Sequence, residues 1–165
     1  MKVALVDNMN NNLFALARYF RQLNIDTHLF LIPDSSHLHF VPEKDTWQDL
    51  KKVPWIKEFP VSYHWKSYLR PIHRLVRREF SAYDKVVACG PSIGLLYRAG
   101  IKVDLFIPYG SDLYNLPFCS KQIRSYKLFK LVFVYFLILY RCHLQKKGIQ
   151  NSKHIISNAN WEVAQ

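Results

Sequence analysis

The chain has 165 residues, of which 50% are hydrophobic and 15% aromatic, so it can form one packed domain and does not belong to the disordered class. Its 23 Lys and Arg against 12 Asp and Glu give a formal net charge of +11. This excess favours a polyanionic partner, either a nucleic acid, an anionic membrane surface or a phosphorylated ligand. The three cysteines form no CxxC pair, which disfavours a disulfide framework or a thiolate zinc site and predicts a reducing compartment.

The amino-terminal part predicts a strand, a helix and a second strand. Residues 3–7 (VALVD) are apolar and β-branched, residues 13–24 carry apolar side chains at helical spacing, and residues 25–33 end on a proline. This order is typical of a βαβ unit in a parallel sheet. The start MKVALVD reaches an Asp after four apolar residues, so we expect no signal peptide and a cytoplasmic protein.

The remaining chain continues the alternation of strands and helices. Residues 34–65 are rich in proline and predict a long connection with one short helix, and residues 66–80 predict a basic helix with Pro71 at a kink or in its first turn. Strands are expected over 84–89, 103–109 and 154–159, and helices over 93–100, within 120–147 and from 161 onward. The predicted fold class is therefore α/β, a single-domain, Rossmann-like three-layer sandwich with a mostly parallel sheet.

An apolar run, LVFVYFLILY, covers residues 131–140. It is shorter than the about 20 residues that a membrane-spanning helix needs. Two interpretations remain open: a helix buried in the core, or a helix that dips into the headgroup region while its basic flanks meet anionic lipid.

Ligands of a parallel sheet bind beyond the carboxyl ends of its strands, which here selects residues 7–12, 89–92, 109–112 and 157–160. The first of these loops has no glycine, so a pyrophosphate could not approach its backbone, and NAD or FAD is not expected. Its amide side chains either cap the next helix or bind a sugar or phosphate: Asn8, Asn10, Asn11 and Asn12.

The other loops also end in polar residues. Gly90 and Ser92 either serve only the start of the following helix or also contact a ligand. The loop after the fourth strand contains Tyr109, Gly110, Ser111 and Asp112. Asp7 and Asp112 are the acids best placed at strand ends. The HLH of residues 37–39 has no evident third ligand, so no metal site is expected.

Basic residues gather in two regions and define a predicted membrane or anion patch. Its members are Arg70, Arg74, Arg77, Arg78, Lys127, Lys130 and Arg141. A solvated helix face is one interpretation, and a surface that faces phosphate or lipid is the one we favour because the apolar run lies in the same half of the chain. The sequence has no recognisable nucleic-acid-binding motif, so a nucleic-acid partner is not expected.

Several segments together resemble the N-terminal domain of GT-B glycosyltransferases, above all the retaining family-four group. They are YDKVVACGPS (83–92), VDLFIPYGSDLYNLPF (103–118) and GIQNSKHIISNANWEVAQ (148–165). In that family a strand commonly ends in a His-Gly-x-Asp type of turn, which YGSD (109–112) matches. Tyr109 stands where many relatives have His, and asparagines stand where many have a Gly-Gly pair in the first loop.

The resemblance implies that residues 1–165 are the acceptor-side domain of an enzyme whose C-terminal, donor-binding domain is absent from this chain. The expected enzyme is a hexosyltransferase of polysaccharide or glycolipid biosynthesis, which moves a sugar from a nucleotide-sugar donor to a polysaccharide or lipid-linked acceptor. The isolated chain is then inactive and binds no cofactor itself, and the expected location is cytoplasmic, with peripheral attachment to the inner face of the plasma membrane.

In this interpretation Tyr109 and Asp112 are the catalytic residues and orient the acceptor hydroxyls. The substrate-binding residues are Asn8, Asn10, Asn11, Asn12, Gly90, Ser92, Gly110 and Ser111. Two alternatives stay open: a stand-alone α/β binding module, and a peripheral membrane or nucleic-acid adaptor without catalysis. The expected partners are the missing domain, a glycan or lipid-linked acceptor and an anionic membrane surface.

Overall fold

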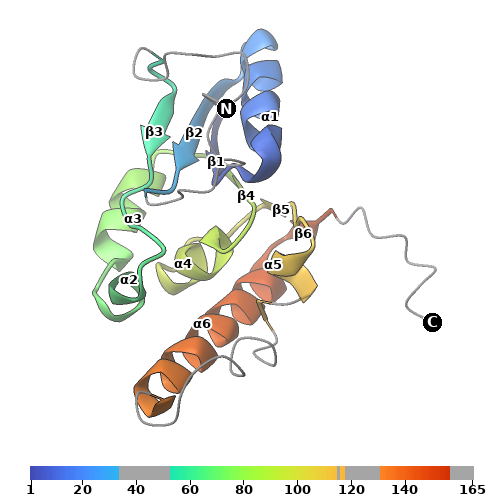
Figure 1. Cartoon of the computed structure of the whole chain (residues 1–165). Coiled ribbons are helices and arrows are strands. Elements are labelled where there is room, and N and C mark those ends of the chain that lie inside the picture. Colours follow the sequence, from blue (N-terminus) through green and yellow to red (C-terminus); the bar gives the residue numbers. More distant parts are fainter. Residues whose placement is uncertain (34–52, 115, 118–130, 157–165) are drawn as a thin grey trace, which may run out of the picture.

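A parallel sheet of six strands forms the centre of the computed structural model, which describes residues 1–33, 53–114, 116–117 and 131–156 (Figure 1). The strands are β1 (Lys2–Val6), β2 (Asp26–Leu31), β3 (Ile56–Glu58), β4 (Lys85–Ala88), β5 (Leu105–Phe106) and β6 (His154–Ile155). Every paired strand is parallel to its neighbour, in the order β3-β2-β1-β4-β5-β6. This is the strand order of the Rossmann-type doubly wound fold, which confirms the predicted fold class.

The helices occupy both faces of the sheet. They are the 3-10 turn η1 (Met9–Asn11) and the α-helices α1 (Asn12–Gln22), α2 (Trp65–Leu69), α3 (His73–Phe80), α4 (Ser92–Arg98), α5 (Ser111–Tyr114) and α6 (Leu131–Asn151). One buried cluster joins the sheet to α3, α4 and α6, and a second joins it to α1 on the opposite face (Figure 1). The switch in winding direction falls between β1 and β4.

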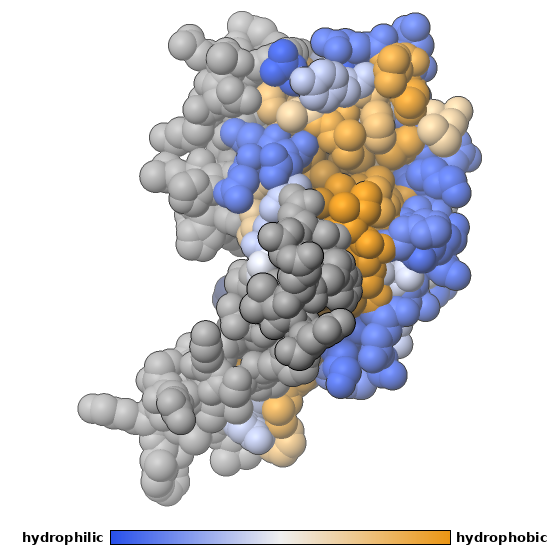
Figure 2. Space-filling model, turned by 90° about the vertical axis from the view of Figure 1, so that its right-hand side faces the viewer, coloured by the Kyte–Doolittle hydropathy of each residue, from blue (hydrophilic) through white to orange (hydrophobic). Residues whose placement is uncertain are grey.

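The face that carries α1 is covered less completely by the described elements. Leu105 and Ile107 are only partly buried there, and Ile156 is 52% exposed. Figure 2 shows an apolar band on this side of the molecule, bordered by polar residues. Parallel sheets normally have both faces covered, so this band is an unusual feature of the described part of the chain.

The close crossing of α4 and α6 depends on glycine. A Cβ atom at Gly148 would lie 2.6 Å from the backbone oxygen of Ile93, and one at Gly94 would lie 3.2 Å from the backbone nitrogen of Gln145. The two helix backbones therefore pack closely, and α6 brings Gln145 to the loops at the carboxyl end of the sheet.

The structure corrects several predicted boundaries. Residues 56–58 form β3 within the region expected to be irregular, and the predicted helix over 66–80 is two helices, with Pro71 between them. The strands near 103–109 and 154–159 are shorter in the described chain, and α6 runs on to Asn151. Residues 37–39 and 161–165 lie outside the described residues. None of the described helices combines the length and apolarity that a membrane crossing requires.

Candidate functional site

The candidate site lies where β1 and β4 end, at the switch in winding direction. Asp7 directly follows β1 and is 1% exposed, with a backbone φ of 72°. Few residues other than glycine adopt a positive φ, and such strain gathers at functional sites. A buried carboxyl group in a strained backbone at this edge of the sheet is therefore the first feature to explain.

Both carboxyl oxygens of Asp7 accept hydrogen bonds. Oδ1 accepts the backbone N–H of Asn8 at 2.8 Å, and Oδ2 accepts the hydroxyl of Tyr63. Gly90, which follows β4, approaches the same carboxyl group so closely that a Cβ atom there would lie 2.6 Å from Oδ2. The three segments that carry Asp7, Tyr63 and Gly90 thus meet at one oxygen atom.

Burial raises the pKa of Asp7 from its ordinary value of 3.8 to about 6. The hydrogen bonds from Tyr63 and from the Asn8 backbone lower the pKa in part, while the nearby charge of Asp112 raises it further. Burial also raises the pKa of the Tyr63 hydroxyl well above its usual value, with the Asp7 charge as the next cause. Asp7 therefore changes charge near pH 6, and Tyr63 stays protonated at that pH.

Asp112 has a different arrangement, because its carboxylate organises the backbone. It is fully buried, and its oxygens accept the N–H of Gly90 at 3.0 Å and of Tyr109 at 2.8 Å. Burial is the main cause that raises its pKa, against these hydrogen bonds. Asp112 thus joins the loops after β4 and β5, and its predicted role in orienting an acceptor stays a prediction.

Gln145, a buried residue of α6, braces the same loops from the other side. Its side-chain nitrogen donates to the backbone oxygen of Gly90 at 3.2 Å and to that of Asp112 at 3.0 Å. Both acceptors are main-chain oxygens, so Gln145 fixes the backbone of the two loops and does not restrict which side chains the loops carry. Gln145 therefore stabilises the site, although its side chain does not point into the site.

The asparagines of the first loop divide into separate roles. Asn8 is buried, donates to the Asn11 side chain at 2.7 Å and accepts the N–H of Phe14 at 2.9 Å, which supports the capping interpretation. Asn10 and Asn11 have φ values of 54° and 57°, the left-handed conformation that asparagine tolerates. The side chain of Asn12 hydrogen-bonds the Tyr109 hydroxyl, whose pKa is raised, chiefly by burial.

The remaining predicted site residues follow β4 and β5. The Ser92 hydroxyl is buried and donates to the backbone oxygen of Cys89 at 2.6 Å, so it serves the turn into α4. Gly90 and Gly110 both have positive φ, 62° and 96°, but Gly90 is the crowded one of the two, because no described atom lies within 4 Å of a Cβ at Gly110. Ser111 begins α5, and its side chain is outside the described part of the structure.

The described members of the predicted basic patch lie on α3, on the connection before it and on α6. Arg70, Arg74, Arg77 and Arg78 are exposed, and Arg77 also donates to the backbone oxygen of Ala99 at 2.9 Å and packs against Gly100. The Arg141 guanidinium lies 5.1 Å from the centre of the Tyr68 ring. Two further members of the patch, Lys127 and Lys130, lie outside the described residues.

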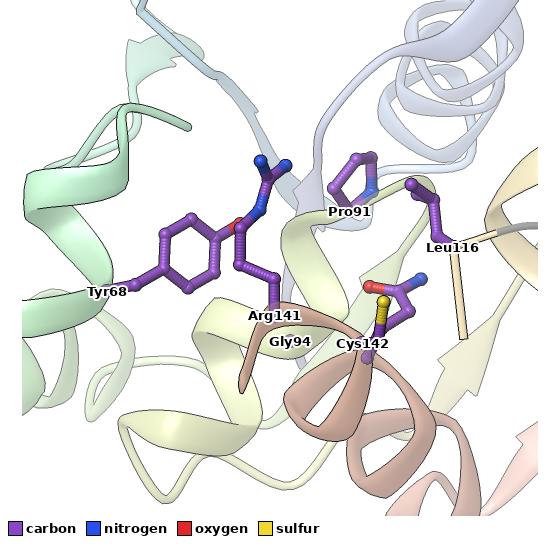
Figure 3. A pocket seen from close by; sticks show the side chains of 7 residues that line it. Tyr68, Pro91, Gly94, Leu116, Arg141 and Cys142 are labelled. Carbon is purple, nitrogen blue, oxygen red and sulfur yellow. The ribbon is translucent and has the colours of Figure 1, made fainter. Parts of the chain in front are cut away.

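A small cavity of about 10 Å³ lies beside the site, between α4 and α6. In Figure 3 the side chains of Arg141 and Tyr68 lie next to each other at one end, and Cys142 and Leu116 lie at the other. The volume holds about one water molecule. The described residues contain no group of three or more metal-ligating side chains.

Sequence reasoning missed two residues of this site, Tyr63 and Gln145. Tyr63 follows β3 by five positions, so the recognition of that strand would have placed it at a carboxyl end. Gln145 is a buried polar residue beside Leu144, and its neighbours in the sequence give no indication of the loops that it binds.

The fold and the site define a Rossmann-like α/β domain with a closed polar cluster at its switch point. No family model and no curated protein matches the chain. A solved structure of a short-chain dehydrogenase/reductase from Veillonella parvula, in complex with NADP, is similar at a TM-score of 0.39 and 8% identity. The match covers 94% of this chain and 67% of that one.

These comparisons correct the resemblance drawn from the sequence. No family model of GT-B glycosyltransferases matches, and the solved structure reported above is a dehydrogenase/reductase, so the assignment to the retaining family-four group is wrong. The motifs quoted for it occur at strand ends, where a Rossmann-like fold places glycines and polar turns whatever its chemistry. Family membership therefore carries no residue roles to this chain.

Proposed function

We propose that the domain binds an uncharged, hydroxyl-rich ligand of the sugar class at the carboxyl ends of β1, β4 and β5. The observation that carries this function is the buried carboxyl group of Asp7 at the switch point. An ionised carboxylate accepts hydrogen bonds from hydroxyl groups. With a pKa of about 6, Asp7 is mostly ionised at neutral pH and can accept such bonds.

The charges at the site disfavour a phosphate group in this position. The charge of Asp112 raises the pKa of Asp7, so a further negative charge beside these two carboxylates meets repulsion. The first loop also lacks the glycines that let a pyrophosphate approach the backbone. These features favour a sugar over a dinucleotide at the end of β1.

The proposed biological role is acceptor binding in a sugar-transfer reaction whose nucleotide-sugar donor is held by another domain. The acceptor oxygen would attack the anomeric carbon, the bond from that carbon to the phosphate oxygen would break, and a nucleoside diphosphate would leave. Asp7 would take the acceptor's proton, because a base with a pKa near the working pH is effective. Tyr109, which hydrogen-bonds Asn12, would orient the ligand.

Calorimetric titration tests the binding function. Wild type, Asp7→Asn and Asp26→Asn are titrated at pH 7.5 with D-glucose, D-galactose, D-mannose, UDP and NADP. Asp26 is an exposed carboxylate on β2 and serves as the matched control. We expect binding of at least one sugar, about tenfold weaker in Asp7→Asn because a charged acceptor is lost, and unchanged in Asp26→Asn. Tighter binding of NADP than of any sugar, or equal sugar affinity in all three proteins, contradicts this function.

A second function, attachment to an anionic membrane surface, is favoured by one observation on α6. Its first turns expose aromatic side chains at helical spacing, with Phe133 57%, Phe136 63% and Tyr140 37% exposed. Exposed aromatic groups on a chain with a net charge of +11 fit the headgroup region of anionic lipid. We propose a peripheral contact there.

Vesicle co-sedimentation tests this contact. Wild type is compared with Phe133→Ser/Phe136→Ser on phosphatidylcholine vesicles with and without phosphatidylglycerol. The control is Leu69→Ser, because Leu69 is 49% exposed on α2. We expect salt-sensitive binding that needs the anionic lipid and is lost in the double variant alone. Equal binding of all three proteins contradicts a role of α6.

A further inference from the structure

We infer that the Tyr63 hydroxyl occupies the place that a ligand hydroxyl takes on Asp7, so that Tyr63 competes with the ligand and helps to set which ligands the site accepts. This inference rests on the proposed function and names the residue that controls the access of the ligand to Asp7. It follows from the burial of Asp7, because a carboxyl group that is 1% exposed cannot meet a ligand unless a neighbour moves.

The surroundings of the carboxyl group single out Tyr63 as that neighbour. Oδ1 is held by the N–H of Asn8, a residue that also caps α1. Gly90 closes the second side, where its own N–H and carbonyl are fixed by Asp112 and Gln145. The third side is closed by a side chain, the Tyr63 ring with its hydroxyl on Oδ2.

Tyr63 belongs to the connection between β3 and α2 and not to a helix or strand. Its ring is half-buried against the core cluster that includes α3 and α4. The residues just before it, 60–62, line an open groove of about 440 Å³ together with residues of α2, α3 and their connection. A displacement of this segment has space on the groove side, whereas hydrogen bonds of Asn8 and Gly90 hold the loops after β1 and β4.

The hydrogen bond itself indicates the chemical class of the ligand. Oδ2 accepts from an uncharged O–H group in the structure, and a sugar hydroxyl can replace that donor without a change in charge. A phosphodiester or a carboxylate cannot make the exchange, because neither has an O–H group at neutral pH and the negative charge of either is repelled by Asp7 and Asp112. The site therefore exchanges one neutral hydroxyl for another.

The variant Tyr63→Phe tests this exchange because it removes the hydroxyl and keeps the ring. The matched control is Tyr97→Phe, since Tyr97 is also partly buried against the same core cluster. Each protein is titrated with D-glucose, D-galactose and D-mannose. We expect Tyr63→Phe to bind about fivefold more tightly than wild type, because one competing hydrogen bond is gone, and Tyr97→Phe to match wild type.

A second readout follows the ring itself. In wild type with selectively labelled tyrosine, the Cζ resonance of Tyr63 should shift when the sugar binds, as its hydroxyl leaves Asp7 for water. A residue that only stabilises the fold would not shift. Thermal unfolding of Tyr63→Phe confirms that the variant is folded before it is titrated.

The outcomes of these experiments distinguish the role of Tyr63 from the proposed sugar-binding function. Sugar binding by wild type that is equal or weaker in Tyr63→Phe, with a Cζ resonance that does not move, overturns the role of Tyr63 and leaves the proposed function standing. Sugar binding by Tyr63→Phe but not by wild type supports the role of Tyr63. In that case the tyrosine hydroxyl of wild type outcompetes the sugar hydroxyl for Asp7. Absence of binding in both proteins overturns the proposed function and this inference with it.

Discussion

Gly90 packs so closely against Asp7 that a Cβ atom at position 90 would lie 2.6 Å from the carboxyl oxygen Oδ2. Gly90 also has a φ of 62°, which side chains other than glycine's rarely adopt. The same residue donates its N–H to Asp112. The loop after β4 therefore depends on a glycine for its conformation and for the approach to Asp7.

Gly90→Ala should destabilise the fold and disturb the site. Backbone strain contributes about 1 kcal/mol or more, and the overlap with Asp7 adds to it, for a total of roughly 2–4 kcal/mol. Gly110→Ala is the control, because Gly110 also has a positive φ but no atom of the described residues within 4 Å of a Cβ at that position. Urea unfolding of both variants measures the difference, and an equal loss at the two positions would show that the contact with Asp7 is unimportant.

Asp7→Asn should stabilise the protein above pH 6. The folded pKa of Asp7, about 6, lies above the ordinary value of 3.8, so its contribution to stability is present at low pH and is lost as pH rises from about 4 to 6. The difference of 6 − 3.8 corresponds to roughly 3 kcal/mol at pH 7 as an upper figure. An asparagine can still accept from Asn8 and donate to the Tyr63 oxygen.

The measurement is the free energy of unfolding of Asp7→Asn and wild type from pH 3.5 to 8. We expect the curves to meet near pH 4 and to separate by pH 7. Ligand binding should show the opposite dependence in wild type and rise through pH 6, because the ionised carboxylate is the acceptor. A constant difference across this range would refute a raised pKa at Asp7.

Gln145→Met should loosen the loops after β4 and β5. The variant keeps the size of the side chain and removes its hydrogen bonds to the carbonyls of Gly90 and Asp112. The expected cost is about 1–3 kcal/mol, because the buried carbonyls lose a donor. Faster amide exchange at Gly90 should accompany it. Gln150→Met, at an exposed position of α6, is the control and should change neither quantity.

Gly148→Ala should weaken the crossing of α4 and α6. The added Cβ would lie 2.6 Å from the Ile93 backbone oxygen, a contact that only a shift of a helix can relieve. The expected net loss is about 1–3 kcal/mol, although alanine gains about 1 kcal/mol of helix propensity. Lys147→Ala, at the exposed neighbouring position, should be close to neutral in the same thermal unfolding experiment.

The sequence pattern correctly predicted the strands and helices whose apolar residues repeat with the period of the element. The strand near residues 3–7 and the helix near 13–24 were recognisable because their apolar residues repeat with the period of the element. β3 was missed because its sequence, Ile-Lys-Glu, is short, charged and surrounded by prolines. Its strand conformation depends on pairing with β2, which is a long-range contact.

The site residues that directly follow strands could be predicted from the sequence, whereas the contacts between separate segments could not. The carboxyl-end rule selected the loops that contain Asp7, Gly90 and Asp112. Tyr63 lies 56 residues along the chain from its partner Asp7, and Gln145 lies 55 residues from its partner Gly90. No periodicity in the sequence encodes contacts over such separations.

The most direct test is a nitrogen-15 NMR titration with the best-binding neutral sugar. We expect shifts concentrated on the backbone amides of Asn8, Gly90 and Tyr109 in wild type, and the loss of these shifts in Asp7→Asn. Shifts that are confined to other parts of the chain, or shifts of these three amides that NADP causes and the sugar does not, would contradict it.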